Sequence, residues 1–105
     1  MTESTTPAAT DPEAPRLLRP LDGELLVGNL GFAWSPVSPL PEGGRYELQL
    51  WPLSEAPRGI VQTAEAAWDG PLVLEPGIYN WRVRVLDAGG QPLAESEPFT
   101  FTWRP

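Results

Sequence analysis

Apolar and polar residues alternate along several short stretches of this chain, and no stretch sustains the 3.6-residue apolar period of a helix. The clearest alternation lies in residues 78–86, where Tyr79, Trp81, Val83 and Val85 share one parity and polar residues occupy most of the other. Because successive side chains of a strand point to opposite faces of a sheet, this pattern predicts a strand with one buried face.

Three further stretches show the same alternation, at residues 30–35, 45–51 and 99–103. Their expected inward positions are large apolar residues, which fill a pleated surface well. These positions are Phe32, Trp34, Tyr46, Leu48, Leu50, Phe99, Phe101 and Trp103. By the same parity rule, Trp34, Trp81 and Trp103 are predicted to lie in the core.

Shorter apolar stretches predict four weaker strands, and their neighbouring Pro residues suit the edges of a sheet. The stretches are residues 17–19, 24–27, 59–63 and 72–74. Residues 63–67 are expected to form at most one helical turn, because so short a segment is not stable as a helix alone. Residues 87–90, with two Gly, predict a turn.

Fourteen Pro and ten Gly interrupt the chain too often for helices of ordinary length. About seven short strands separated by turns predict an all-β fold, a two-sheet antiparallel sandwich over residues 16–105, with a small barrel as the alternative. Residues 1–15 hold Thr, Ala, Pro, Ser and acidic residues, and Met1 is their one sizeable apolar side chain. They predict a disordered acidic Pro/Thr-rich tail or linker.

The segment Leu74-Glu75-Pro76-Gly77-Ile78-Tyr79-Asn80-Trp81-Arg82-Val83 resembles strand F of fibronectin type III and related bacterial immunoglobulin-like domains. Phe32-Ala33-Trp34-Ser35-Pro36 is similar to their strand B, and Pro20-Leu21-Asp22-Gly23 is similar to their opening turn. The resemblance covers most of residues 20–103. It implies a tyrosine corner, in which the Tyr79 hydroxyl donates to backbone upstream. The Leu-to-Tyr spacing is one residue shorter than in typical animal modules, which favours the bacterial ones.

The composition, with 105 residues of which 41% are hydrophobic and 20% charged, is that of one globular domain. Seven basic residues face fourteen acidic ones, for a formal net charge of −7. Nucleic acid is therefore not an expected partner, because phosphate binding needs clustered positive charge. No apolar run is long enough to cross a bilayer, so membrane insertion is not expected either.

The chain contains no His and no Cys, so the usual general base and the commonest ligands of transition metals are missing. We therefore expect no enzyme activity, no catalytic residues, no metal and no cofactor. The compartment is not predicted from this composition. A native Met1 start would indicate the cytoplasm, and a fragment could derive from a secreted or cell-surface protein.

Two pairs of polar residues are expected on one exposed sheet face. Glu47 and Gln49 alternate with the buried positions of their strand, and Arg82 and Arg84 do so in theirs. Strands C and F pair in the fold that the sequence resembles, which would place the two pairs side by side. The face is either a solvated polar surface or a docking surface.

Two Trp residues fall outside the predicted inward positions. Trp51 has the outward parity of its strand, and Trp68 lies in a turn-like segment. Open indoles would stack on sugar rings or anchor a protein partner, whereas covered ones would form the rim of the core.

These patterns predict a noncatalytic protein–protein interaction or spacer module within a larger bacterial protein or assembly. The alternative is a carbohydrate-binding accessory domain that uses Trp51 and Trp68. A protein is the expected partner in the first case and a carbohydrate in the second.

Overall fold

The structure is a computed structural model that describes residues 14–37, 40–70 and 72–105. Residues 1–13 of the predicted tail lie outside the described residues. The division into a tail and a domain therefore stays a prediction.

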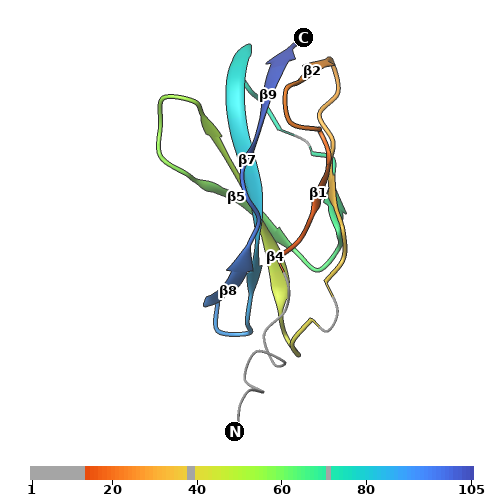
Figure 1. The fold of residues 1–105 in the computed structure, drawn as a ribbon, viewed down its shortest axis with the longest axis vertical. Helices are drawn as coiled ribbons and strands as arrows, with labels where there is room; N and C mark the ends of the chain where they lie inside the picture. Colours follow the sequence, from red (N-terminus) through yellow and green to blue (C-terminus); the bar gives the residue numbers. More distant parts are fainter. Residues whose placement is uncertain (1–13, 38–39, 71) are drawn as a thin grey trace, which may run out of the picture.

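The described residues form nine strands and no helix, arranged in two sheets that pack face to face (Figure 1). The strands are β1 (Leu17–Arg19), β2 (Glu24–Val27), β3 (Phe32–Trp34), β4 (Arg45–Pro52), β5 (Gly59–Thr63), β6 (Ala67–Trp68), β7 (Gly77–Leu86), β8 (Pro92–Glu95) and β9 (Phe99–Arg104). The predicted all-β sandwich is confirmed.

The small sheet has the strand order β1-β3-β6, and the large sheet has the order β2-β9-β7-β4-β5. Strand β8 also pairs with β7, along the part of β7 that follows its pairing with β9. Every pair is antiparallel except β2 with β9. After β1 the chain crosses from the small sheet to the large one. It then runs beside the last strand in the same direction, and the Gly23 N–H donates to the Thr100 carbonyl at 2.6 Å where this pairing begins.

The core between the sheets is aromatic, as the alternation predicts. Trp34, Trp81 and Phe101 are at most 1% exposed. The Phe32 ring lies edge-on to Trp81, with the ring centroids 5.1 Å apart, and to Phe101 at 5.9 Å. Such edge-to-face contacts add to the free energy gained from burying apolar area. Trp103 has the predicted inward parity, but it is only partly buried because it lies near the end of the last strand.

Two local predictions are wrong. Residues 72–74 form no strand, although Leu72 and Leu74 do pack against the core and Val73 is 95% exposed. The alternation there reflects an extended segment covering the core without a strand partner. Residues 63–67 form a bend and no helical turn, since Ala67 pairs with Ala33 as part of β6.

The predicted tyrosine corner is confirmed. The Tyr79 hydroxyl donates to the Glu75 carbonyl at 2.6 Å, and the ring stacks on Phe101 with the centroids 5.9 Å apart. Burial raises the pKa of Tyr79 above its ordinary value, and the negative charges of Glu75 and Glu55 raise it further, while the bond to the Glu75 carbonyl acts in the opposite direction. The hydroxyl thereby ties the end of the loop to the central strand β7.

Candidate interaction surface

Five of the six predicted site residues lie together on the outer face of β4 and β7. In the antiparallel register Glu47 is directly opposite Arg84, and Gln49 is directly opposite Arg82. The expected pairing of these two strands is therefore confirmed. Trp51 follows on the same face of β4, opposite Asn80.

Arg82 is the centre of this group, which we call the outer ladder: Glu47, Gln49, Trp51, Arg82 and Arg84. Its Nε donates to the Gln49 Oε1 at 2.6 Å, and its Nη1 lies 3.3 Å from the Glu95 Oε2. Its guanidinium carbon lies 5.5 Å from the centroid of the Trp51 ring, within the range of a cation–π contact. Three separate partners therefore hold one Arg side chain flat against the sheet.

Two members of the outer ladder are less exposed than their outward parity predicts. Gln49 and Trp51 are each only 6% exposed. Because β4 is an inner strand of the large sheet, its side chains have neighbours on both sides. Arg82 then bonds to one of these residues and lies against the other. The expectation of an exposed Gln49 is wrong for this reason.

The pair of Glu47 and Arg84 is looser. The Arg84 Nε lies 3.7 Å from the Glu47 Oε1, too far for a hydrogen bond, and this buried nitrogen has no hydrogen-bond partner among the described residues. The Glu47 carboxylate lies over Gly59 of β5, where an added Cβ would come within 2.7 Å of the Glu47 Oε2. The absence of a side chain at Gly59 thus leaves room for Glu47.

Trp68 does not join this surface. It belongs to β6 of the small sheet, opposite Phe32, and its ring is nearly parallel to the Phe32 ring at 6.4 Å. It is partly buried against the core. Trp51 and Trp68 therefore lie in different sheets: Trp51 is covered by Arg82 on the outer face, and Trp68 packs against the core.

Sequence reasoning missed a second feature of the outer face, which we call the outer apolar row: Leu53, Ile78, Thr102 and Leu25. The Leu53 N–H donates to the Ile78 carbonyl, Ile78 is opposite Thr102, and Thr102 is opposite Leu25. Leu53 is 56% exposed, Ile78 47% and Leu25 48%. Parity alone indicates that Ile78 faces outward, but only the register with β9 shows that Leu25 shares its row.

Metal and membrane signals are both lacking in the part of the chain that the structure describes. Residues 14–37, 40–70 and 72–105 include no group of three acidic side chains placed to hold a metal ion. The same ranges include no helix long and apolar enough to span a bilayer.

No family model and no curated protein matches this sequence. The two packed sheets and the tyrosine corner define a β-sandwich domain of the immunoglobulin-like class. More specifically, the chain has a fibronectin type III-like fold. Its structure is similar to the solution structure of the fibronectin type-III domain of human fibronectin type III domain containing protein 3, with a TM-score of 0.64 and 19% sequence identity. The similarity covers 100% of this chain and 94% of that one.

Proposed function

We propose that this chain is a noncatalytic module that contacts a partner protein through the outer face of its large sheet. The observation that supports this is the outer apolar row. Soluble domains seldom leave neighbouring large apolar side chains exposed unless the surface is an interaction site. Here Leu53 adjoins Ile78, and Thr102 lies between Ile78 and Leu25, so the four residues form one line across the sheet.

The outer ladder borders this row and would form the polar part of the same contact. Interfaces combine an apolar centre with a polar rim, and Trp and Arg are enriched among the residues that contribute most to binding. Arg82 is already fixed by Gln49, Glu95 and Trp51. A partner would therefore lose little side-chain entropy in using it.

The same proposal includes a place within a larger, bacterial protein or assembly. The bacterial origin rests on the short spacing between Leu74 and Tyr79 and stays a prediction. A spacer without a partner of its own is the second form of this role.

The carbohydrate alternative has no observation in its favour, because the indoles of Trp51 and Trp68 lie in different sheets and do not form one open platform. A nucleic-acid partner is not favoured either, because the net charge of −7 would repel phosphate groups.

Affinity capture from cells of the source organism, followed by mass spectrometry, tests this proposal. The whole chain would be used beside two variants, Ile78→Glu in the outer apolar row and Val73→Glu as the matched control. Val73 is also an exposed apolar residue, but it lies in the loop before β7 and outside the row. We expect Ile78→Glu to lose the captured partner and Val73→Glu to retain it.

The melting temperature of both variants must stay close to that of the parent chain for the comparison to hold. A partner retained by both variants would show that the contact lies elsewhere on the domain. No specific partner for the parent chain would favour the spacer role.

A further inference from the structure

The sequence contains two Asp-Gly pairs, Asp22-Gly23 and Asp69-Gly70. In such a pair the Asp carboxyl group can react with the backbone nitrogen of the next residue, and Gly has no Cβ to shield that nitrogen. Asp22 and Asp69 are both exposed, so exposure alone does not distinguish the two pairs. They differ in the hydrogen bonds of the carboxylate and of the Gly N–H group.

Both reacting groups of Asp22-Gly23 are hydrogen-bonded to the last strand. The Asp22 Oδ1 accepts from the Thr100 N–H at 2.8 Å, and the Gly23 N–H donates to the Thr100 carbonyl at 2.6 Å. These bonds direct the carboxylate and the nitrogen toward Thr100 and not toward each other. Because the pair lies where the parallel pairing of β2 with β9 begins, both bonds must open before the two groups can react.

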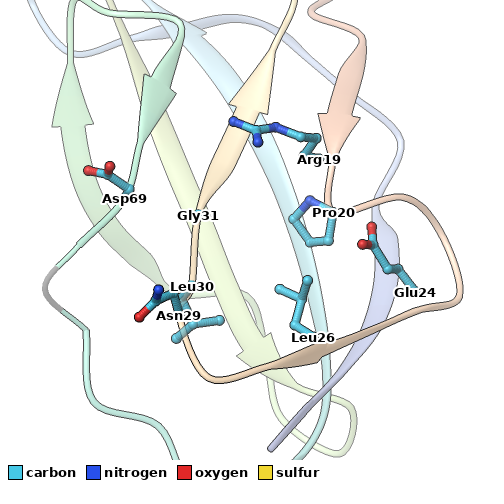
Figure 2. A pocket seen from close by; sticks show the side chains of 8 residues that line it. All are labelled: Arg19, Pro20, Glu24, Leu26, Asn29, Leu30, Gly31 and Asp69. Atoms are coloured by element: carbon cyan, nitrogen blue, oxygen red, sulfur yellow. The ribbon is translucent and has the colours of Figure 1, made fainter. Parts of the chain in front are cut away.

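Asp69-Gly70 lacks such bonds. Neither its carboxylate nor its Gly N–H has a hydrogen-bond partner among the residues that the structure describes. Asp69 directly follows β6, and Figure 2 shows its carboxylate directed away from the other side chains around a hollow of about 330 Å³. Gly31 lies beside it, and even an added Cβ there would stay 3.8 Å from the Asp69 Cβ. Gly70 has a φ of 97°, which favours Gly, so the fold itself requires the residue type that reacts most easily.

We propose that Asp69 is a site of spontaneous isomerisation to isoaspartate in the folded chain, whereas Asp22 is protected. The Gly70 nitrogen attacks the Asp69 Cγ, the nitrogen loses its proton, and one carboxyl oxygen leaves as water. The succinimide ring formed in this way then takes up one water molecule. Addition at Cγ restores Asp69, and addition at the main-chain carbonyl carbon leaves the peptide linkage running through Cβ and Cγ. The step is an isomerisation, so it consumes no oxidant or co-reactant.

The new linkage changes both the main chain and the charge at the end of β6. It adds one methylene to the main chain directly after a strand that pairs with β3 at only two residues, Ala67 and Trp68. It also moves the free carboxylate onto the Cα of residue 69. An α-carboxylate of this kind is the group that isoaspartyl methyltransferases esterify with S-adenosylmethionine. The modified chain would therefore be a substrate for enzymes of that class, and the unmodified chain would not.

Ageing of the folded whole chain at neutral pH, followed by peptide mapping, tests this proposal. Because the chain has no Lys and trypsin does not cut between Arg19 and Pro20, digestion places the two pairs in separate peptides, residues 17–45 and 59–82. Isoaspartate in each separated peptide is measured by methyl transfer from labelled S-adenosylmethionine with an isoaspartyl methyltransferase. We expect it to accumulate about tenfold faster or more in residues 59–82, because two hydrogen bonds protect the other pair.

Two variants and one unfolded sample complete the design. Asp69→Glu keeps the charge but would have to close a larger ring, which forms much more slowly, so isoaspartate should disappear from residues 59–82. The matched variant Asp22→Glu should leave the rate in that peptide unchanged. In urea the hydrogen bonds to Thr100 are lost, and the parent chain should accumulate isoaspartate in both peptides at similar rates.

Several results would overturn the proposal. Equal accumulation in the two peptides of the folded chain would show that the bonds to Thr100 give no protection. No accumulation in residues 59–82 of the folded chain would show that the main chain there prevents ring closure. The same excess in urea would place the cause in the neighbouring residues of the sequence and not in the fold. Isoaspartate that persists in Asp69→Glu would come from Asn80, which lies in the same peptide.

Discussion

The hydroxyl of Tyr79 and the ring of Tyr79 contribute separately to the fold. The ring packs on Phe101, and the hydroxyl satisfies the Glu75 carbonyl. Tyr79→Phe removes only the hydroxyl and leaves a partly buried acceptor without its donor, so we expect the free energy of unfolding to fall by about 1–3 kcal/mol. Urea denaturation measures this, with equal slopes confirming that the unfolded states are alike. An unchanged midpoint would mean that the corner does not stabilise the domain.

The raised pKa of Tyr79 predicts a loss of stability in alkali. In the unfolded chain the hydroxyl ionises near its ordinary pKa of 10.0, whereas in the folded chain burial keeps it protonated to higher pH. Below the ordinary value both states hold the proton and stability is unaffected. Above it the unfolded state loses its proton first, so the free energy of unfolding falls as the pH rises toward the folded pKa.

Urea midpoints measured from neutral pH to above the ordinary tyrosine pKa test this sign. The parent chain should lose stability more steeply than Tyr79→Phe, which lacks the titrating hydroxyl. Parallel curves for the two chains would contradict the assignment to Tyr79.

The buried indoles of Trp34 and Trp81 differ in whether their N–H group has a hydrogen-bond partner. The Trp81 indole N–H donates to the Pro20 carbonyl at 3.3 Å, whereas the Trp34 indole N–H is buried without a partner among the described residues. Substitution by Phe leaves a cavity at both positions, but only Trp34→Phe also removes an unsatisfied donor. We therefore expect Trp34→Phe to cost less than Trp81→Phe, by about 1–2 kcal/mol. Thermal or urea unfolding of both variants decides this, and equal costs would indicate that the Trp34 donor is satisfied in solution.

At the scale of the element, the pairing of β4 with β7 predicts that the facing side-chain pairs of the outer ladder have unequal coupling energies. Gln49 and Arg82 share a hydrogen bond of 2.6 Å, whereas Glu47 and Arg84 approach only to 3.7 Å without one. Double-mutant cycles with Ala should give about 1 kcal/mol for the first pair and about 0.5 kcal/mol or less for the second. A stronger coupling for Glu47 with Arg84 would show that the carboxylate moves closer in solution.

The elements that the sequence predicts well are those with several alternating residues. Strand β7 has four inward apolar side chains in regular alternation, and residues 45–51 have three, so each pattern determines which face of its strand is buried. Strand β6 has two residues, too few for any pattern. Residues 72–74 alternate because they cover the core, and only the lack of a neighbouring strand distinguishes them from a strand.

The candidate surface also has some features that the sequence predicts and others that it does not. Parity and strand pairing correctly brought Glu47, Gln49, Arg82 and Arg84 to one face. They did not show that Gln49 and Trp51 are covered, because coverage depends on the side chains of adjacent strands. The outer apolar row was also missed, since it combines residues from several strands and a turn whose register no local pattern specifies.

For the whole molecule, the sequence predicts that the N-terminal tail adds nothing to stability. Residues 1–14 contain few apolar side chains that could repay the entropy of ordering them. Deleting them should leave the free energy of unfolding unchanged within error, as measured by urea denaturation beside the full chain. A clear loss of stability would show that this segment packs on the domain.

The parallel pairing of β2 with β9 has a mechanical consequence. A force that draws the two ends of the chain apart would first meet β1, which pairs with β3 at only two residues, Leu17 and Arg19. It would then pull β2 and β9 along their length in opposite directions, because both run the same way and are bonded side by side (Figure 1). Their hydrogen bonds would be loaded in shear, all together, whereas those of a hairpin opened from one end give way one after another. A domain joined in this way would resist extension until the whole ladder between β2 and β9 failed at once. In a spacer, that resistance would be the useful property.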